Sequence, residues 1–340
     1  MNKSVTVNDV AKAVGVSGRT VSRVVNGDSN VSEKVRAAVN KAILDLGYRP
    51  NLAARSLKTN KSFLIGLIMP NIDSAYYRAI QTYVGNACAE QGYHVVIEKV
   101  GPDEESALFQ SRKFLGEVKL AGVILVLGTV NSPKIRALVK AQGYPYAAIT
   151  TLDHLTDFPS VIANEEAGEI ALANHLFSQG HKRYVVVTAP PDIQYSRGLA
   201  FESQLLGLGV SPEHIYKFEF DWHLPGLEAG RRVAVEIIDR GLKCTAMFAS
   251  NDEMAAGAIG SFLSNGISIP EDISVVGFDD SAVAQATWPQ LTTVRQPIDD
   301  MARQALSHII QFAAEDMSVT TCPIELILRH STAPPKSAII

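Results

Sequence analysis

The spacing of apolar residues changes near residue 62, which predicts two regions of different structure. Before this point, apolar residues recur with a helical period, as at Val35, Val39, Ile43 and Leu46. After it, short apolar runs of strand length alternate with amphipathic stretches of helix length. Such alternation is typical of β-α-β units that build a parallel sheet. We therefore expect an all-α head followed by an α/β body.

Start and stop signals divide the head into three predicted helices. Thr6 and Ser17 precede the first two, and their side-chain oxygens suit amino-terminal caps. Gly15 suits a tight turn between them, because glycine adopts backbone conformations that other residues resist. Asn26-Gly27 and Gly47 are stop signals. The predicted helices cover residues 7–13, 18–25 and about 32–46.

The body contains enough strand-like runs for two parallel sheets. The expected strands are residues 63–69, 95–98, 122–127, 146–149, 184–188, 245–249 and 273–278. The expected helices between them include residues 75–91, 165–179, 227–240 and 252–265. A doubly wound sheet binds ligands at the carboxyl ends of its strands. Two facing lobes of this kind would share one ligand cleft.

The distribution of charge separates the head from the body. The 340 residues carry a net charge of −4, with 46% hydrophobic and 19% charged residues, which is typical of a packed globular protein. Residues 1–61 hold eleven Lys or Arg and four Asp or Glu, whereas the rest holds twenty and thirty-one. A basic head on an acidic body suggests that the head meets a polyanion such as nucleic acid. A basic surface that is merely solvated is the alternative.

Several classes of protein are disfavoured by missing signals. The chain starts without the basic and apolar run of a signal peptide, and it has no apolar stretch of membrane-spanning length. Cys88, Cys244 and Cys322 lie far apart and suggest neither disulfides nor zinc. Nucleotide-binding, hydrolase and metalloprotease motifs are missing, and the eight histidines are scattered. We expect a cytoplasmic protein that is no enzyme, with no catalytic residue, cofactor, metal or membrane partner.

The first two helices have the spacing of a helix-turn-helix. Ala11 is the small residue, Gly15 the turn glycine and Val21 the apolar anchor that two closely crossing helices need. The second helix would enter the DNA major groove with its amino-terminal side chains facing base edges. Arg19 suits two hydrogen bonds to a guanine, and Arg23, one turn later, suits a base or a phosphate. Simple exposure of both arginines is the alternative. Short donors suited to phosphates are Ser17, Thr20, Ser22 and Asn26.

A family resemblance rests on three stretches of the chain. Residues 6–11 (Thr-Val-Asn-Asp-Val-Ala) and 15–26 look like the head of the lactose-repressor (LacI/GalR) family, and residues 48–57 are similar to its hinge. The resemblance extends from about residue 5 to 333. It implies a transcriptional regulator, most often a repressor, that binds a palindromic double-stranded DNA operator as a homodimer. The chain ends soon after Pro335 without a leucine heptad, which also favours a dimer over a tetramer.

The resemblance extends to DNA contacts in the hinge. Leu57 matches a leucine that intercalates in the minor groove, and Ala54 matches a minor-groove contact; an ordinary linker role for Leu57 is the alternative. Gly18 departs from members that carry a large side chain there, so their operator sequences do not transfer. The predicted DNA-contacting residues are Thr6, Ser17, Gly18, Arg19, Thr20, Ser22, Arg23, Asn26, Asn51, Ala54, Arg55 and Leu57.

The resemblance also implies a domain plan. The body would be like a periplasmic binding protein, with two lobes of doubly wound parallel sheets, three crossovers and a ligand in the cleft. The expected parts are a DNA-binding domain at 1–47, a hinge and linker at 48–61, an effector-binding and dimerisation domain at 62–333, and a tail at 334–340. Lobe one would hold about 62–162 and 298–316, and lobe two about 163–293 and 323–331.

Nine residues match the family's effector-binding positions: Ser74, Tyr76, Tyr77, Thr150, Arg197, Trp222, Asn251, Asp279 and Gln296. Aromatic rings stack on sugar C–H surfaces while polar groups hold hydroxyls. Alternatives are an interlobe salt bridge for Arg197, a turn cap for Asp279 and core packing for Trp222. Asp252, beside Asn251, could cap the next helix instead of reaching the ligand. Thr150 stands where several relatives carry Asp, and the segment 161–165 also departs from the family pattern.

These observations predict a regulator whose operator affinity changes when a sugar or sugar derivative alters how the lobes close. A purine-type effector is an alternative ligand. A cytosolic or exported sugar-binding protein without a DNA role is the alternative function. Whether the effector induces or co-represses is left open by the sequence.

Overall fold

A computed structural model describes residues 5–25, 30–48, 56, 60–151, 155–189, 197–221, 224–313, 315 and 317–336. The chain forms two compact units, residues 1–63 and residues 64–340. No helix in these ranges is both long and apolar enough to cross a membrane.

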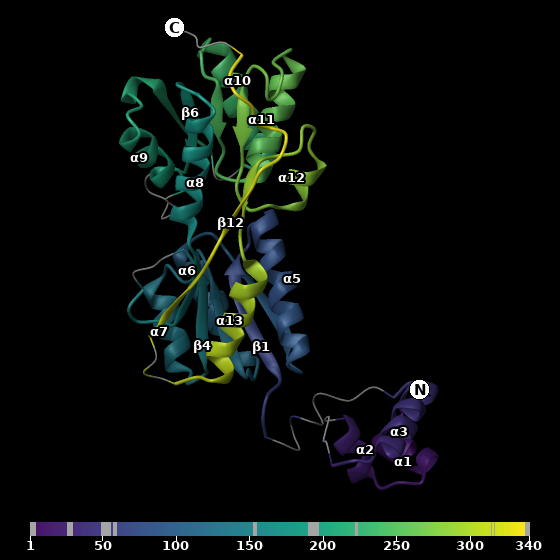
Figure 1. Cartoon of the computed structure of the whole chain (residues 1–340). Helices are drawn as coiled ribbons and strands as arrows, with labels where there is room; N and C mark the ends of the chain where they lie inside the picture. Colours follow the sequence, from purple (N-terminus) through teal and green to yellow (C-terminus); the bar gives the residue numbers. More distant parts are fainter. Residues whose placement is uncertain are drawn as a thin grey trace. The chain divides into compact units, whose positions relative to one another are not determined.

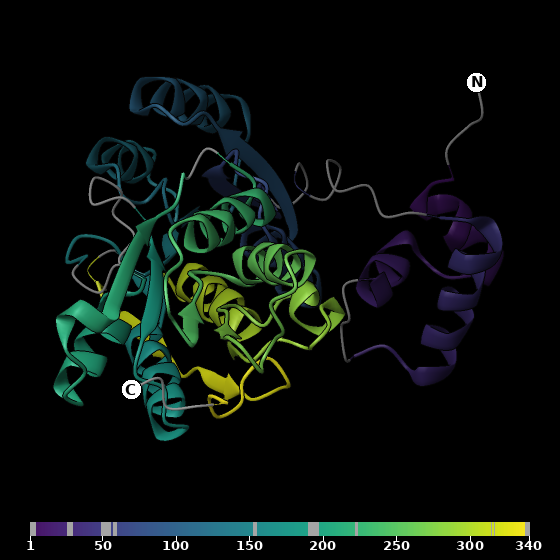
Figure 2. The same ribbon diagram turned by 90° about the horizontal axis from the view of Figure 1, so that it is seen from above.

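The head consists of three helices (Figure 2), which pack around a small apolar core. They are α1 (Val7–Val14), α2 (Gly18–Val25) and α3 (Glu33–Leu46). The buried core side chains are Val10, Ala11, Val21, Val24 and Val39. Gly15 follows α1 with a φ of 72°, and Gly47 follows α3 with a φ of 65°, in the left-handed region that favours glycine. The three predicted helices, the turn at Gly15 and the stop at Gly47 are therefore confirmed.

Side chains close the first turns of α1 and α2. The backbone N–H and the hydroxyl of Thr6 both donate to the Asp9 carboxylate, at 2.8 and 2.7 Å. At the start of α2, the Ser17 hydroxyl oxygen accepts from the backbone N–H of Thr20 at 3.1 Å. The predicted Ser17 cap is confirmed, and Asp9 is an anchor that the sequence analysis did not identify.

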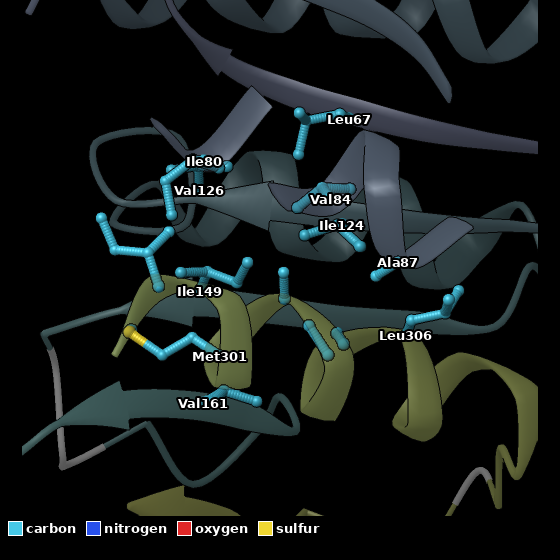
Figure 3. Packing of buried hydrophobic residues seen from close by; sticks show 14 of the residues in the cluster. Leu67, Ile80, Val84, Ala87, Ile124, Val126, Ile149, Val161, Met301 and Leu306 are labelled. Carbon is cyan, nitrogen blue, oxygen red and sulfur yellow. The ribbon is translucent and has the colours of Figure 1, made fainter. Parts of the chain in front are cut away.

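Lobe one of the body is a six-stranded parallel sheet in the order β11-β5-β4-β3-β1-β2 among the described residues. Its strands are β1 (Leu64–Pro70), β2 (His94–Val100), β3 (Gly122–Val126), β4 (Tyr146–Thr150), β5 (Ser160–Ala163) and β11 (Val319–Cys322). Its helices are α5 (Ala75–Glu90), α6 (Glu104–Glu117), α7 (Pro133–Ala141) and α13 (Ile298–Ile310). Ile80 and Val84 of α5 and Met301 and Leu306 of α13 pack on one face of the sheet (Figure 3), while Phe114 of α6 packs on the other.

Lobe two has a four-stranded parallel sheet in the order β7-β6-β8-β9 within the described part of the chain. Its strands are β6 (Tyr184–Thr188), β7 (Ile215–Glu219), β8 (Ala246–Phe248) and β9 (Ser274–Val276). Its helices are α8 (Glu165–Ser178), α9 (Leu199–Gly207), α10 (Gly226–Asp239), α11 (Asp252–Ser264) and α12 (Ala282–Ala286), with a 3₁₀ turn η1 at Pro212–His214. The buried side chains of α8 and α9 form one core cluster, and those of α10 and α11 form another.

The two lobes are joined where the chain passes from one sheet to the other. Over the described ranges it crosses after β5, after β10 (Thr293–Arg295), and between β11 and β12 (Glu325–Ile327) (Figure 1). The strands β10 and β12 pair antiparallel. Each crossover is short, so the lobes can change their mutual angle through a few residues.

The structure contains strands that the apolar pattern did not predict. These are β5, β7, β10, β11 and β12. Of the strand expected at 323–331 in lobe two, only Glu325–Ile327 forms a strand, β12, which pairs with β10; β11 precedes that range and pairs with β5 in lobe one. The sequence of β11 is Val-Thr-Thr-Cys, with two of its four residues exposed, so it lacks the apolar run by which the buried strands were recognised.

Candidate functional site

The head presents a polar face of α2 away from its core. Val21 and Val24 are buried against the other helices, whereas Arg19 is exposed and Ser22 and Arg23 are partly exposed. Positions 19, 22 and 23 follow the i, i+3, i+4 spacing that places side chains on one face of a helix. That face therefore carries Arg19 in the first turn of α2, and a hydroxyl and a second cationic side chain, Ser22 and Arg23, in its second half.

The remaining predicted contacts of the head differ in how they are held. The Ser17 and Thr20 hydroxyl oxygens lie 2.9 Å apart at the start of α2. A Cβ at Gly18 would lie 3.2 Å from the Asn8 side-chain oxygen, so a larger residue would press on α1. Thr6 is bound to Asp9. The predicted residues Asn26, Asn51, Ala54, Arg55 and Leu57 lie outside the described residues.

The body contains a cavity of about 600 Å³ between its two lobes. Lobe one lines it with residues after β1, β2 and β3, and lobe two with residues after β6, β7 and β8 and just beyond β9. These are carboxyl ends of parallel strands, where doubly wound folds bind ligands. Six of the predicted effector-binding residues line it: Ser74, Tyr76, Tyr77, Arg197, Asn251 and Asp279.

Arg197 is the cation at the centre of the lobe-two wall, and it is almost fully buried. Its Nη2 lies 2.5 Å from Glu165 Oε1, and its Nη1 lies 3.2 Å from Asp279 Oδ1. Nη1 also donates to the Ser250 carbonyl oxygen at 2.7 Å. The guanidinium carbon lies 4.0 Å from the centroid of the Phe278 ring. All these partners belong to lobe two, so neither ion pair, with Glu165 or with Asp279, is an interlobe salt bridge.

Asp279 is held in place by strained backbone and by two side chains. It has a φ of 112°, which residues other than glycine rarely adopt, and such strain clusters at functional sites. Its Oδ1 accepts from Gln296 Nε2 at 2.7 Å as well as from Arg197. Burial raises the pKa of Asp279, while Arg197 acts to lower it. The turn cap suggested as an alternative role for Asp279 is supplied by Asp252, whose Oδ2 accepts from the Ser281 N–H at 2.7 Å.

Asn251, and not Asp252, caps α11. Asn251 Oδ1 accepts from the Met254 N–H at 2.8 Å. Asp252 is the first residue of the helix and turns inward, where it also accepts from the Thr293 hydroxyl at 2.5 Å. Burial and the neighbouring Asp279 raise the pKa of Asp252. The helix cap suggested for Asp252 is therefore wrong, and its carboxyl group instead ties α11 to the segment around Ser281.

The two tyrosines of the lobe-one aromatic pair, Tyr76 and Tyr77, differ in their hydrogen bonds. The Tyr77 hydroxyl donates to the Leu127 carbonyl oxygen at 3.1 Å, and its backbone N–H donates to Ser74 Oγ at 3.4 Å. The Tyr76 ring meets the Tyr77 ring edge-on at 5.5 Å. The Tyr76 hydroxyl is buried with no hydrogen-bond partner among the described residues, and burial raises its pKa well above the usual value. Tyr76 thus brings an unused polar atom to the lobe interface.

Other predicted effector residues lie elsewhere. Gln296 lines a neighbouring cavity of about 690 Å³ and keeps a buried side-chain oxygen without a partner in the described part of the chain. Thr150 is buried at the end of β4 and does not line the cavity beside Tyr76 and Arg197. Trp222 lies outside the described residues.

The sequence analysis missed three acidic residues that shape this site. Glu165 pairs with Arg197, and Glu253 in α11 pairs with Arg78 in α5 at 2.8 Å across the lobes. Glu169 accepts from the backbone N–H groups at the start of α9, next to Arg197. The only signal was the unusual segment 161–165. No group of three or more side chains in the described ranges has a geometry that would hold a metal ion.

Two family models match the chain. Residues 6–51 match "Bacterial regulatory proteins, lacI family", and residues 173–332 match "Periplasmic binding protein-like domain". Among curated relatives, the HTH-type transcriptional regulator GalS of Salmonella typhimurium is 33% identical and covers 99% of both chains. Catabolite control protein A of Priestia megaterium is 28% identical over 97% of this chain and 99% of its own.

Solved structures show the same likeness. A lac repressor dimer bound to operator and the anti-inducer ONPF is 26% identical, with a TM-score of 0.74 over 97% of this chain and 100% of that one. A complex of the regulator CelR with cellobiose is 25% identical, with a TM-score of 0.68 over 96% and 99%. The helical head and the periplasmic-binding-protein-like body predicted from the sequence are thereby confirmed.

Proposed function

Because the chain belongs to the LacI family of bacterial regulatory proteins, whose members are DNA-binding transcriptional regulators, we propose that its operator affinity is controlled by a sugar or sugar derivative in the interlobe cavity. The resemblance stated from the sequence is confirmed at the level of family and of regulator function. The observation that carries the effector role is the cavity itself, which combines apolar walls with the buried Arg197, Asp279 and Tyr76 groups.

The exposed face of α2 supports the DNA role. Arg19 has no interaction partner among the described residues, so it would lose none on entering the major groove. It is also the side chain best placed to read a guanine. Ser17, Thr20, Ser22 and Arg23 would set the register on phosphates. The lac repressor, which resembles this chain over nearly its full length, binds its operator as a dimer. We infer a homodimer on a palindromic operator, acting in the cytoplasm and mainly as a repressor.

We place the domain boundaries near those of the compact units. The hinge, about residues 48–61, precedes the junction at residues 63 and 64. The body, about residues 62–333, holds both lobes. In this division β11 belongs to lobe one, which extends that lobe beyond residue 316.

A sugar suits the cavity for chemical reasons. Similar regulators have been solved with cellobiose and with ribose. Tyr76, Phe220 and Leu224 offer apolar surface for sugar C–H groups, while Asp279 and Asn251 carry polar atoms for hydroxyls. No catalytic role is proposed for these residues.

Control of DNA binding would follow from lobe closure. The Arg78–Glu253 ion pair and the Tyr76 hydroxyl lie where the lobes meet, so a bound sugar favours one mutual arrangement of the lobes. A ligand shifts a conformational equilibrium only by its difference in affinity for the two states. That difference would be transmitted through the body to the spacing of the two heads in the dimer.

The test uses the full chain and a pool of random palindromic duplexes. Selection should recover one sequence, and a sugar from a neutral panel should change the affinity for it. Arg19→Ala should weaken operator binding and relax the preference at one base pair per half-site, without changing sugar binding. If the protein bound none of the duplexes in the pool, the DNA-binding role would be refuted. If a purine, and none of the sugars, changed the affinity for operator, the effector would be a purine and not a sugar.

A further inference from the structure

Charge is unevenly distributed around the interlobe cavity. Among its described lining residues, five carboxylates face one cation, Arg197. The carboxylates belong to Asp73, Asp103, Glu104, Glu253 and Asp279. Three of the rim carboxylates are paired, Glu104 with Lys134 and both Asp73 and Glu253 with Arg78. A cleft lined mostly by one sign of charge repels ligands of that sign.

The single cation is already neutralised. Glu165 meets two nitrogens of Arg197 side by side, Oε1 at 2.5 Å from Nη2 and Oε2 at 3.4 Å from Nε. That edge of a guanidinium is the one that grips phosphates and carboxylates in a fork. Nη1 is held by Asp279 and by the Ser250 carbonyl oxygen. An anionic ligand would therefore have to displace a carboxylate of the protein itself.

Burial makes that displacement costly. The side chains of Arg197, Glu165 and Asp279 are 4%, 13% and 8% exposed. A carboxylate that loses its cation in such a place is left buried and unpaired, which is strongly unfavourable. The cluster also holds two carboxylates against one guanidinium, so a further anion adds repulsion.

The groups left for a ligand suit hydroxyls. The Tyr76 hydroxyl is buried without a partner in the described part of the chain and can bond an alcohol, whereas Gln296 Oε1, likewise without a partner there, lines the neighbouring cavity that Tyr76 and Asp279 also line. Asp279, fixed by Arg197 and Gln296, is an acceptor beside them. None of these groups compensates a negative charge on the ligand.

We propose that Glu165 is a specificity-determining residue that occupies Arg197 and restricts the cavity to uncharged polyhydroxyl ligands, excluding phosphorylated and carboxylated sugars. This inference rests on the proposed effector role of the cavity. It makes Glu165 a positioning residue for Arg197 and predicts that removing its charge opens the site to anions.

Inorganic phosphate is the first probe, because it needs no knowledge of the natural effector. Its binding to the full chain is measured by calorimetry against sodium chloride of equal ionic strength. Wild type should show no saturable phosphate binding in the millimolar range. Glu165→Gln should bind phosphate at least about tenfold more tightly than wild type. Adding Arg197→Gln to that variant should abolish the gain.

Two further variants serve as controls. Glu166→Gln removes the neighbouring exposed carboxylate of the same helical turn and should behave as wild type. Glu165→Asp keeps the charge and should restore exclusion of phosphate. Phosphate binding by wild type that depends on Arg197, or no gain in Glu165→Gln, would overturn the inference.

A second experiment needs wild type alone and therefore does not depend on the folding of a variant. Ribose and glucose are compared with ribose 5-phosphate and glucose 6-phosphate. Any parent sugar that binds should do so at least about a hundredfold more tightly than its ester. An ester that binds as well as its parent would overturn the inference. If no sugar changes operator affinity, the proposed function fails, whereas the phosphate experiment still decides the role of Glu165.

Discussion

Glu169 should make the stability of the body depend on pH. Its Oε2 accepts from the backbone N–H groups of Gly198, Ala200 and Phe201 at 2.8, 3.1 and 3.1 Å. The residue is 4% exposed. Burial raises the pKa of Glu169 from 4.5 to about 7, although the backbone N–H groups act to lower it. We predict that Glu169→Gln removes part of the pH dependence of unfolding.

The direction of the change in unfolding free energy with pH follows from which state of the protein, folded or unfolded, keeps the Glu169 proton. Below pH 4.5 both the folded and the unfolded state carry the proton; between 4.5 and about 7 only the unfolded state releases it, so rising pH destabilises the fold. At about 1.4 kcal/mol for each pKa unit, the loss approaches roughly 3 kcal/mol above pH 7. Glutamine never ionises. The free energy of unfolding of the variant should therefore gain about 3 kcal/mol relative to wild type across this window.

Urea unfolding of the full chain, followed by tryptophan fluorescence, measures this difference. Both tryptophans, Trp222 and Trp288, lie in the body, so the signal reports the body and not the head. Glu166→Gln, on the exposed side of the same helix, should track wild type at every pH. A difference between Glu169→Gln and wild type that does not change with pH would show that folding leaves the pKa of Glu169 unshifted and would refute the reasoning.

Three further predictions concern the DNA contact and the packing of lobe two. The logarithm of operator affinity should fall linearly with the logarithm of salt concentration, because phosphate contacts release counterions; affinity independent of salt in an anisotropy titration would contradict this. Arg19→Ala should cost on the order of 1–3 kcal/mol of operator binding and relax preference at one base pair per half-site, which competition with single-base variants measures; equal losses on all duplexes would make Arg19 a phosphate contact. Gly257→Ala should strongly destabilise the body in urea unfolding, because its Cβ would lie 2.0 Å from the Leu227 carbonyl oxygen. A Cβ at Gly260 in the same helix would meet nothing within 4 Å, so Gly260→Ala should be neutral or stabilising. Similar effects of both changes would contradict the close crossing of α10 and α11.

Elements with a local chemical signal at their ends were predictable from the sequence. The stretch expected at 165–179 is α8 at Glu165–Ser178, and the one expected at 252–265 is α11 at Asp252–Ser264. Asn164 and Asn251 cap these two helices. Local chemistry decides such boundaries, so a single sequence reveals them.

Features that depend on approach between distant segments were not predictable. The strand β11 is held in the lobe-one sheet by pairing with β5, although it has no apolar run of its own. Glu165 reaches Arg197 only because α8 and the segment before α9 are packed together. The same packing brings Glu169 under the first turn of α9. Six of nine effector positions reached the cavity wall because the family resemblance, and not periodicity, selected them.

The most direct test of coupling between the cavity and the head is reciprocal binding. The affinity of the full chain for its selected operator is measured with and without the sugar, and the affinity for the sugar is measured with and without operator. Linkage requires both ratios to be equal, and we predict a common factor between about 5 and 150. A sugar that binds with dependence on Arg197 yet leaves operator affinity unchanged would contradict the proposed regulator.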